Sequence, residues 1–366
     1  MALSVPRYSR RQVDAAGEFL ILPSSPFGFS DKVHSFGPED DAMDIVNNWR
    51  AAHNWPLYTI RKTLENRAKH ISPLAVIAQR IKRLPSIQAK LQREQSRHLK
   101  LTQVEDIGGC RAVMATAADA IALVETYKSR GLVSELHRSR DYMAQPKPDG
   151  YRSIHLIYKY RSDSERYKVF DNLRIEIQIR SYLQHLWATA LETVETFAQM
   201  QIRRTSGSML LRPKEYLVLW RRFFTLISSA MAVIEGQPIV PETLSDHAEL
   251  VRELRSVDAE LHVKSSLLSW TSAMSYLPLS THTADAYWFL MRLTPERTYL
   301  QIDTFKKEES VQAFNEYISA EQPQRDAPST QVVLVSVDSI KTLREAYPNY
   351  FADTKAFVQQ FEGIIG

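Results

Sequence analysis

The clearest pattern in the chain is the strict alternation of apolar and polar residues over residues 173–180. Leucine and isoleucine occupy the odd positions, and the even positions hold Arg174, Glu176, Gln178 and Arg180. A period of two is typical of a β-strand with one buried face. Burial explains the apolar residues, but a surface strand more often carries Thr, Lys or Ser than one carboxylate between two guanidinium groups. The pattern therefore predicts a strand whose polar face lines a site for a polyanion, with Glu176 as a metal ligand or a base.

The segments around this strand predict an α/β (α+β) core, a mixed sheet with helices packed on it. A loop-like stretch over 1–40 precedes a helical region over 41–105, which is rich in Arg and Lys and interrupted at Pro73 and Pro85. Further elements follow from the apolar periods and from the closing Gly131. They are strands at 106–114, 132–136 and 153–160, and helices at 117–130 and 181–197.

The last third of the chain predicts a separate, smaller unit. Residues 198–270 have a mostly helical pattern, and a stretch dense in Ser and Thr follows over 271–283. Beyond it, the pattern predicts strands at 286–292 and 298–305 around a turn at 294–297, a helix at 309–320, a strand at 331–337 and a final helical stretch. We therefore predict a first domain over 1–270 and a C-terminal domain over 280–366.

The composition of the chain excludes only a few classes of function. The chain has 366 residues, of which 44% are hydrophobic and 24% are charged, and its net charge is +4. Any nucleic-acid contact must therefore come from local patches. A single cysteine, Cys110, excludes a disulfide framework or a Cys-rich zinc module and fits a reducing cytosol. Without a secretion signal or an apolar run near 20 residues, we expect a cytoplasmic protein outside the membrane; its oligomeric state stays open.

A turn rich in Pro and Gly leads directly into the strand at 153–160. In that strand Tyr151, Ser153 and His155 share one face, and Lys147 lies in the turn before it. An aromatic ring beside a lysine and a histidine can stack on a base while cations hold its phosphates. On these residues alone, a turn with a tyrosine that supports the sheet is the commoner interpretation.

Carboxylates and cations elsewhere add possible chemistry. Asp106 stands just before a Gly pair and a strand, and with Glu176 it could chelate Mg²⁺, although a turn cap explains it equally well. The helical region upstream carries basic residues, for which a solvated face is the default. A nucleotide-binding P-loop and the kinase signatures are absent from the sequence. The basic residues are Arg67, Lys69, Arg80, Lys82 and Arg83.

Five spaced motifs together resemble the RelA/SpoT synthetase domain over roughly residues 60–200. This family transfers the β,γ-pyrophosphate of ATP to a ribose hydroxyl, on a nucleotidyltransferase-like core. The motifs are Arg67-x-Lys69, Asp106 to Arg111, Asp141-Tyr142, Pro146 to His155 and Glu176 to Arg180.

The resemblance implies roles for individual residues. Arg67 and Arg111 would enclose the adenine of ATP, and Lys69 would reach its phosphates. Asp106 and Glu176 would hold Mg²⁺, and Glu176 would also activate the attacking hydroxyl. Tyr151 would stack on the acceptor base. The remaining acceptor-binding residues would be Lys147, His155, Gln178 and Arg180.

The chain departs from the family in two ways. His185 stands where the short alarmone synthetases commonly have Asn or Asp, and the hydrolase half of the long members is absent. The tail around Tyr347 and Tyr350 resembles that of the fused toxin–antitoxin members, the CapRel type. There a zinc-finger-like α+β domain without its metal covers the synthetase, the Tyr-x-x-Tyr element occupies the ATP site, and a phage capsid protein releases it. Packing of two tyrosines within their own domain is the alternative.

Three functions follow as hypotheses. The first is a pyrophosphokinase of phage defence that modifies the 3′ end of tRNA, blocks translation and is inhibited by its own C-terminal domain. The second is a synthetase of the (p)ppGpp or (p)ppApp type with a regulatory tail. The third is a non-catalytic RNA-binding sensor. For tRNA, the predicted patch includes Arg203 and Arg204, with basic neighbours at Arg212, Lys214, Arg221 and Arg222.

Overall fold

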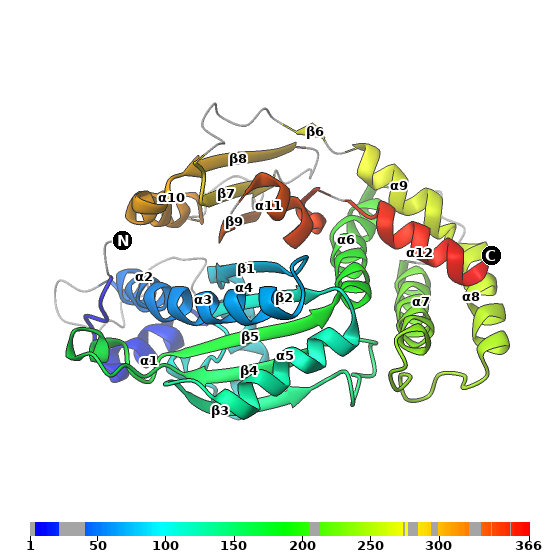
Figure 1. Cartoon of the computed structure of the whole chain (residues 1–366). Coiled ribbons are helices and arrows are strands. Elements are labelled where there is room, and N and C mark those ends of the chain that lie inside the picture. Colours follow the sequence, from blue (N-terminus) through cyan, green and yellow to red (C-terminus); the bar gives the residue numbers. More distant parts are fainter. Residues whose placement is uncertain are drawn as a thin grey trace.

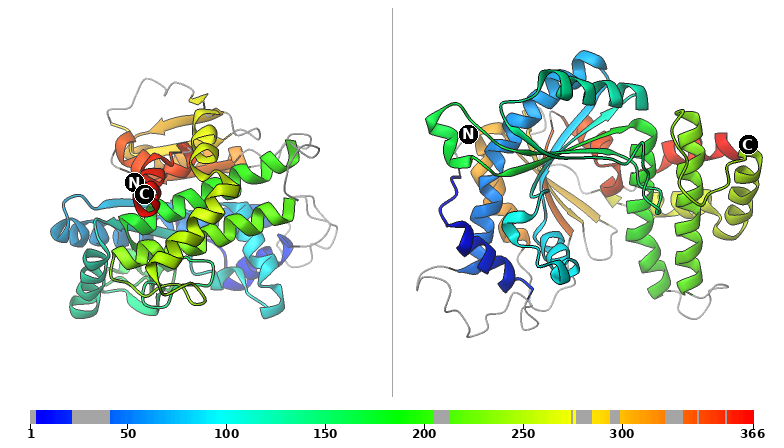
Figure 2. Two further views of the ribbon diagram at one scale, coloured as in Figure 1. Left: turned by 90° about the vertical axis from the view of Figure 1, so that its right-hand side faces the viewer. Right: turned by 90° about the horizontal axis from the view of Figure 1, so that it is seen from below.

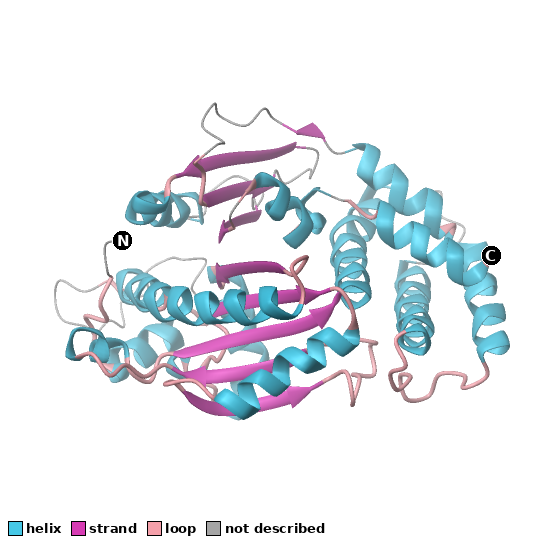
Figure 3. Ribbon diagram, in the orientation of Figure 1, coloured by secondary structure: helices cyan, strands magenta, loops and turns pink. Residues whose placement is uncertain are grey.

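The computed structural model of the chain has one mixed sheet of nine strands with helices on both sides (Figures 1 and 3). The structure describes residues 4–21, 41–204, 213–273, 275–276, 285–293, 299–321, 331–337, 339–351 and 353–366. The predicted turn at 294–297 and most of the Ser/Thr-rich stretch lie outside these ranges.

The strand order is β3-β4-β5-β2-β1-β9-β7-β8-β6. Strands β2 and β5 run parallel, and each of the pairs β1–β2, β3–β4 and β4–β5 is antiparallel. The strands are β1 (Val76–Ile81), β2 (Gly108–Met114), β3 (Glu135–Asp141), β4 (Ile154–Lys159), β5 (Arg174–Ser181), β6 (Ser275–Tyr276), β7 (Trp288–Leu293), β8 (Tyr299–Phe305) and β9 (Gln331–Ser336).

Helices cover both faces of the sheet, and α6 to α9 gather with α12 at one end of the molecule (Figures 1 and 2). The N-terminal helices are α1 (Arg10–Phe19), α2 (Ala42–Ala52), α3 (Asn54–Ile71), α4 (Leu84–Arg93) and α5 (Ala117–Arg130). Those after the core strands are α6 (Tyr182–Arg204), α7 (Pro213–Ile234), α8 (His247–Leu261) and α9 (Val263–Ala273). The tail adds α10 (Ser310–Glu321), α11 (Ile340–Ala346), the 3₁₀ turn η5 (Pro348–Phe351) and α12 (Lys355–Ile365).

The alternation along each strand divides the core into two clusters. On one face, side chains such as Ile177 and Leu334 pack with α3, α5 and α10. On the other, Val335 and Phe289 pack with α6, α7, α11 and α12. This second face also carries Glu176, because side chains of period two point to opposite sides. The polar face predicted from the sequence therefore continues, across the sheet, into the apolar face that the tail helices cover.

The C-terminal strands extend the sheet of the N-terminal half. Strand β9 pairs with β1 over only Gln79↔Ser336 and Arg80↔Val335, whereas β1 and β2 pair over six positions. The mixed sheet with flanking helices confirms the predicted α/β class. The division into two domains and the zinc-finger-like character of the tail stay predictions, but the two halves meet along a narrow line of backbone pairing.

Three predicted elements were wrong. The loop-like N-terminal stretch contains α1, and the helical region over 41–105 contains β1. The six residues of β1 are too few and too apolar for periodicity to separate a strand from a helix. The strand expected at 132–136 lies at 135–141 instead, because β3 is a mostly exposed edge strand and its polar sequence has no apolar alternation.

Helix α7 is the one described helix that is long and apolar enough to cross a membrane. Its window Glu215–Ile234 has a mean hydropathy of 1.5, and 56% of the window is buried inside the structure. Buried core helices pass the same test of length and composition. The buried positions include Trp220 and Phe223, which pack in the second core cluster.

A buried ion pair fastens the tail to the first half of the chain. Arg50 of α2 contacts Glu321 of α10 at 2.7 Å, with side chains 0% and 4% exposed. The Arg50 guanidinium also donates to Asn47 and to the hydroxyl of Tyr317. The second carboxylate oxygen of Glu321 accepts the backbone N–H of Leu84 at 3.0 Å, at the start of α4. One carboxylate thus joins three helices.

We expect Glu321→Gln to lower the free energy of unfolding by about 3–5 kcal/mol, because it leaves a buried guanidinium without its counter-charge. Denaturant unfolding measures this. The matched control is Glu308→Gln, an exposed carboxylate beside the same helix, which should change stability by about 0.5 kcal/mol or less. Equal stability of the two variants would contradict the role given to the pair.

Candidate active site

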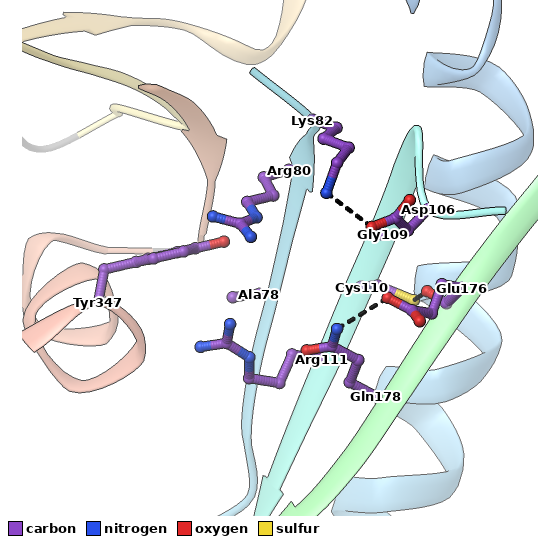
Figure 4. A pocket seen from close by; sticks show the side chains of 10 residues that line it. All are labelled: Ala78, Arg80, Lys82, Asp106, Gly109, Cys110, Arg111, Glu176, Gln178 and Tyr347. Carbon is purple, nitrogen blue, oxygen red and sulfur yellow. Dashed lines mark hydrogen bonds and ion pairs between the residues drawn. The ribbon is translucent and has the colours of Figure 1, made fainter. Parts of the chain in front are cut away.

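Three neighbouring strands, β1, β2 and β5, bring predicted polar residues to one pocket. In the register, Glu176 lies opposite Gly109, and Gln178 lies opposite Arg111, which in turn lies opposite Ala78. Paired residues project to the same face of a sheet. Gly109 has no side chain, so the space beside Glu176 stays open. The pocket is lined by Ala78, Arg80, Lys82, Asp106, Gly109, Cys110, Arg111, Glu176, Gln178 and Tyr347 (Figure 4).

Glu176 is held by a chain of hydrogen bonds. His155 Nδ1 lies 2.9 Å from one carboxylate oxygen, and the amide of Gln178 donates to the other at 2.7 Å. His155 Nε2 lies 2.8 Å from the hydroxyl of Tyr151. Burial by itself would raise the pKa of Glu176, but the hydrogen bonds from His155 and Gln178 leave this pKa below its usual value. The carboxylate is therefore ionised and fixed in orientation at neutral pH.

Asp106 lies in the same pocket between two lysines. Its carboxylate oxygens contact Lys82 Nζ at 2.7 Å and Lys90 Nζ at 2.8 Å. Burial would raise the pKa of Asp106, and the two ammonium groups hold it well below its ordinary value instead. Two carboxylates in one pocket suit Mg²⁺, which takes its other ligands from water and substrate phosphates. Asp106 and Glu176 would hold that ion; among the described residues no group of three or more His, Cys, Asp or Glu side chains exists to bind it alone.

Three arginines face the site without a carboxylate partner among the described residues. They are Arg80, Arg111 and Arg180, from three different strands. The Nε atoms of Arg111 and Arg180 are buried and make no hydrogen bond. Burial and the neighbouring Arg111 lower the pKa of Arg180 to about 9. Arg180 is buried and the other two are partly buried, and cations removed from water without a counter-charge are costly, so this arrangement indicates a site for a strongly anionic ligand.

The end of helix α11 occupies part of this site. Tyr347 reaches toward β1 between the side chains of Arg80 and Arg111 (Figure 4), and the Arg111 guanidinium carbon lies 5.7 Å from the tyrosine ring centre. Arg111 also donates to the carbonyl of Ala346 at 3.2 Å. His185 Nε2 donates to the carbonyl of Glu345 at 2.7 Å. The last carbonyls of α11 thus accept hydrogen bonds from Arg111 of β2 and His185 of α6.

With Tyr347 in place, the pocket holds a cavity of about 40 Å³. Pockets for ligands of nucleotide size measure roughly 300–1,000 Å³. The cations and carboxylates are assembled, but the space for a nucleotide is not open. Tyr350, the second tyrosine of the pair, is buried against Tyr347 with ring centres 6.5 Å apart and does not line the cavity.

The structure does not bring Arg67 and Lys69 to this pocket. The Arg67 guanidinium donates to the carbonyls of Thr126 and Gly131 and packs on the Tyr127 ring at 4.4 Å. Lys69 contacts Glu65. Arg67 thus joins α3 to the end of α5, and Lys69 forms an ion pair within α3. In the structure, Arg80 and Lys82 line the pocket in which Arg67 and Lys69 were expected.

Arg80 and Lys82 were assigned to a helix because their strand was missed. The signal was available in the sequence, because they have the same Arg-x-Lys spacing at the end of a short apolar run of strand length. Lys90 and Gly109 were not singled out as separate site residues. Only the folded sheet shows that α4 supplies a second lysine to Asp106.

Three of the predicted acceptor residues, Lys147, Tyr151 and His155, lie together at the start of β4, whereas Gln178 and Arg180 lie on β5. The Lys147 ammonium lies 4.6 Å from the ring centre of Tyr142 and 4.7 Å from that of Tyr151. Gly150 has φ +93°, and a Cβ there would lie 2.9 Å from Ser228 Cβ. The Ser228 hydroxyl donates to the Gly150 carbonyl at 2.7 Å. Helix α7 therefore supports the turn that positions Tyr151.

The remaining predicted patch is only partly visible. Helix α6 extends to Arg204, but the side chains of Arg203 and Arg204 lie outside the described residues. Arg222 of α7 forms an ion pair with Glu253 at 2.6 Å, and Arg221 is exposed.

Comparison with known proteins agrees with this geometry over part of the chain. Residues 79–197 match the family described as a region found in RelA / SpoT proteins. The chain is 31% identical over 130 residues to the GTP pyrophosphokinase YjbM of Bacillus subtilis strain 168, which covers 36% of this chain and 60% of that protein. It is 29% identical over 122 residues to GTP pyrophosphokinase YwaC of the same strain, covering 32% and 56%. The chain thus spans about six-tenths of the length of these relatives.

Among solved structures, the small alarmone synthetase 1 from Bacillus subtilis, bound to its product pppGpp, is 23% identical. That match covers 50% of this chain and 93% of the other, with a TM-score of 0.37. The family match begins within β1 and ends within α6, so it includes Arg80, Asp106, Tyr151 and Glu176 and excludes Arg67 and the tail. Residues 79–197 of this chain are therefore similar to the region found in RelA / SpoT proteins.

Proposed function

We propose that the chain is an ATP-dependent pyrophosphokinase that its own tail holds inactive. The observation that carries the proposal is the single pocket in which Glu176, Asp106 and the unpaired arginines meet Tyr347. A hydroxyl oxygen of the acceptor would attack the β-phosphorus of ATP, and the bond from that phosphorus to the α–β bridging oxygen would break. AMP then leaves, and the pyrophosphoryl group stays on the acceptor. The hydroxyl proton passes to the Glu176 carboxylate.

The residues supply positioning and charge, which dominate catalysis of phosphoryl transfer. Arg80, Arg111 and Lys82 would bind ATP and balance its phosphates. A Mg²⁺ ion bound to Asp106 and Glu176 would neutralise further phosphate charge. His155 orients the Glu176 carboxylate, and Tyr151 at the other end of that hydrogen-bond chain is placed to stack on the acceptor base.

For the acceptor we propose the 3′ end of tRNA, whose modification would block translation. The supporting observation is a row of cations on the sheet face of Glu176, Lys159 and Arg174 among them, which exceeds the size of one nucleotide. A guanine nucleotide is the second candidate, because the two relatives named above are GTP pyrophosphokinases. ATP labelled at the γ-phosphate distinguishes the two: labelled tRNA supports the first acceptor, and labelled GDP or GTP alone supports the second.

For the tail we propose an inhibitory role, released by a phage protein such as a capsid subunit. The support is that the tail and ATP would compete for Arg111. Its guanidinium donates to the Ala346 carbonyl and faces Tyr347, and in the open form it would bind ATP instead. His185 adds a second link, from the core to the Glu345 carbonyl. A partner that binds the displaced tail would shift the population toward the open form.

Glu176→Gln should reduce pyrophosphoryl transfer by about 10²–10⁴-fold, because the amide cannot accept the proton. The measurement is release of AMP with γ-labelled acceptor, made in a chain that also carries Tyr347→Ala so that the pocket is open. Glu125→Gln, an exposed carboxylate on α5, is the matched control and should leave the rate unchanged. A Glu176→Gln chain that retains the full rate would exclude this carboxylate as the base.

Tyr347→Ala should tighten the binding of a non-hydrolysable ATP analogue about tenfold, because the competent form becomes the major one. Titration calorimetry measures it. Removal of a buried aromatic ring also destabilises by about 3–5 kcal/mol, so the control is Phe314→Ala. Phe314 is a buried aromatic of the same tail, on the opposite face of the sheet. Tighter binding in both variants, or in neither, would contradict occlusion by Tyr347.

The His185 link predicts a pH dependence of stability. A carbonyl only accepts and a guanidinium only donates, so His185 is neutral, with its proton on Nε2 and with Nδ1 accepting from Arg180. Burial, Arg180 and Arg111 hold the pKa of His185 well below its ordinary 6.5. The unfolded chain binds a proton below 6.5 and the folded chain does not, so stability falls as pH decreases below 6.5.

The loss is up to about 1.4 kcal/mol for each pH unit below 6.5. His185→Gln should reduce it, because the glutamine amide donates and accepts but does not titrate. Thermal unfolding from pH 7 to pH 5 measures the difference. His53, whose pKa burial lowers to about 4, adds its own slope to both chains. Identical pH dependence of the two chains would show that folding does not lower the pKa of His185.

A further inference from the structure

We propose that a polymeric RNA acceptor binds over a cationic surface at the β3 edge of the sheet. This inference rests on the proposed function, since it names where that reaction's acceptor lies outside the pocket. We call the set the β3 edge surface; it consists of Arg138, Arg140, Lys159, Arg161 and Arg174.

The strand register places this surface beside Glu176. Ile157 of β4 lies opposite Glu176, and the next residue on the same face, Lys159, lies opposite Arg174. On β3, Arg138 lies opposite Ile157 and Arg140 lies opposite His155. Directly paired residues share a face, so these cations lie on the same sheet face as Glu176, with the buried side chain of Ile157 between Glu176 and Arg138.

The charges on this surface are unbalanced. Glu105 contacts Arg138 at 3.1 Å and Arg140 at 2.9 Å. Glu135 contacts Lys159 at 3.2 Å and Arg161 at 3.1 Å. Arg174 donates to the carbonyl of Gln103 and has no carboxylate partner among the described residues. Five cations against two carboxylates leave an excess of three positive charges.

The surface is open to solvent. The Arg138 side chain is 50% exposed and that of Arg161 is 38% exposed. Charges on an edge strand also prevent pairing with other chains, and that role alone would explain Arg138 and Arg140. It does not explain Lys159 and Arg174, which lie on inner strands of the sheet and continue the row toward Glu176.

The extent of the surface favours a polymer over a free nucleotide. At about 3.4 Å per residue, Arg174 lies about 7 Å along β5 from Glu176, and Arg161 lies about as far again beyond Lys159. Strand β3 is two strands, about 10 Å, from β5. A nucleotide seated between Tyr151 and Glu176 fills the near end only. The phosphates that precede the 3′ end of an RNA would extend over the rest.

The test compares two double variants of the full chain. Arg138→Ala with Arg161→Ala removes two exposed cations, each paired with one carboxylate. Lys128→Ala with Arg252→Ala is the matched control, because Lys128 and Arg252 are likewise exposed and paired with Glu125 and Glu249, on helices α5 and α8. Filter binding of bulk tRNA is measured at several salt concentrations, with affinity for the non-hydrolysable ATP analogue measured in parallel.

We expect the β3 edge variant to bind tRNA about tenfold more weakly and to lose about one unit of salt slope per removed contact, with ATP binding unchanged. The control should match the unchanged chain. Equal tRNA affinity in the two double variants would overturn the inference. The acceptor is tested separately, by labelling with the pocket opened through Tyr347→Ala. If tRNA binds over this surface but only GDP or GTP becomes labelled, the proposed acceptor is wrong while the surface stands.

Discussion

The structure depends on one continuous sheet face that two parts of the chain share. Side chains of β5, β2 and β1 place Glu176, Arg111 and Arg80 on it, and β9 and β7 continue it with Val335 and Phe289. The apolar half must be covered, and α11 with η5 covers it. Because the face is continuous, the end of α11 reaches the polar half, where Tyr347 meets Arg111. The proposed restraint of the site thus follows from the burial of the tail's own core.

The contacts between tail and site are weaker than those a nucleotide would make. Arg111 donates a hydrogen bond to the neutral carbonyl of Ala346 and lies over the ring of Tyr347. Arg80 and Arg180 have no carboxylate partner among the described residues. Arginine binds phosphate with two parallel charge-assisted hydrogen bonds, which add both energy and geometric specificity. Phosphate oxygens would therefore satisfy the arginines better than the tail does. The two-residue pairing of β9 with β1 adds little backbone restraint at the same place, which fits a tail that is displaced rather than permanently attached.

The sequence predicted strands and site residues best where the alternation of apolar and polar residues was clear. Strand β5 is buried on one face and polar on the other, so its period identified both the strand and Glu176. Strand β1 is short and apolar, and β3 is exposed, so neither has a distinctive period; the first was missed and the second was displaced. Because β1 was not predicted, the ATP contacts were assigned to Arg67 and Lys69 instead of Arg80 and Lys82. The contacts of Arg111 with Ala346 and of Glu321 with Arg50 join residues more than 200 positions apart, which periodicity and spacing do not reveal.

The central claim is that ATP and the tail occupy the same site in turn. Hydrogen exchange of the unmodified chain, with and without a saturating non-hydrolysable ATP analogue and Mg²⁺, tests it most directly. The account predicts faster exchange of the backbone amides of α11 and η5 when the analogue is bound, while β2 and β5 stay protected. An analogue that binds and leaves α11 and η5 equally or more protected would contradict the account.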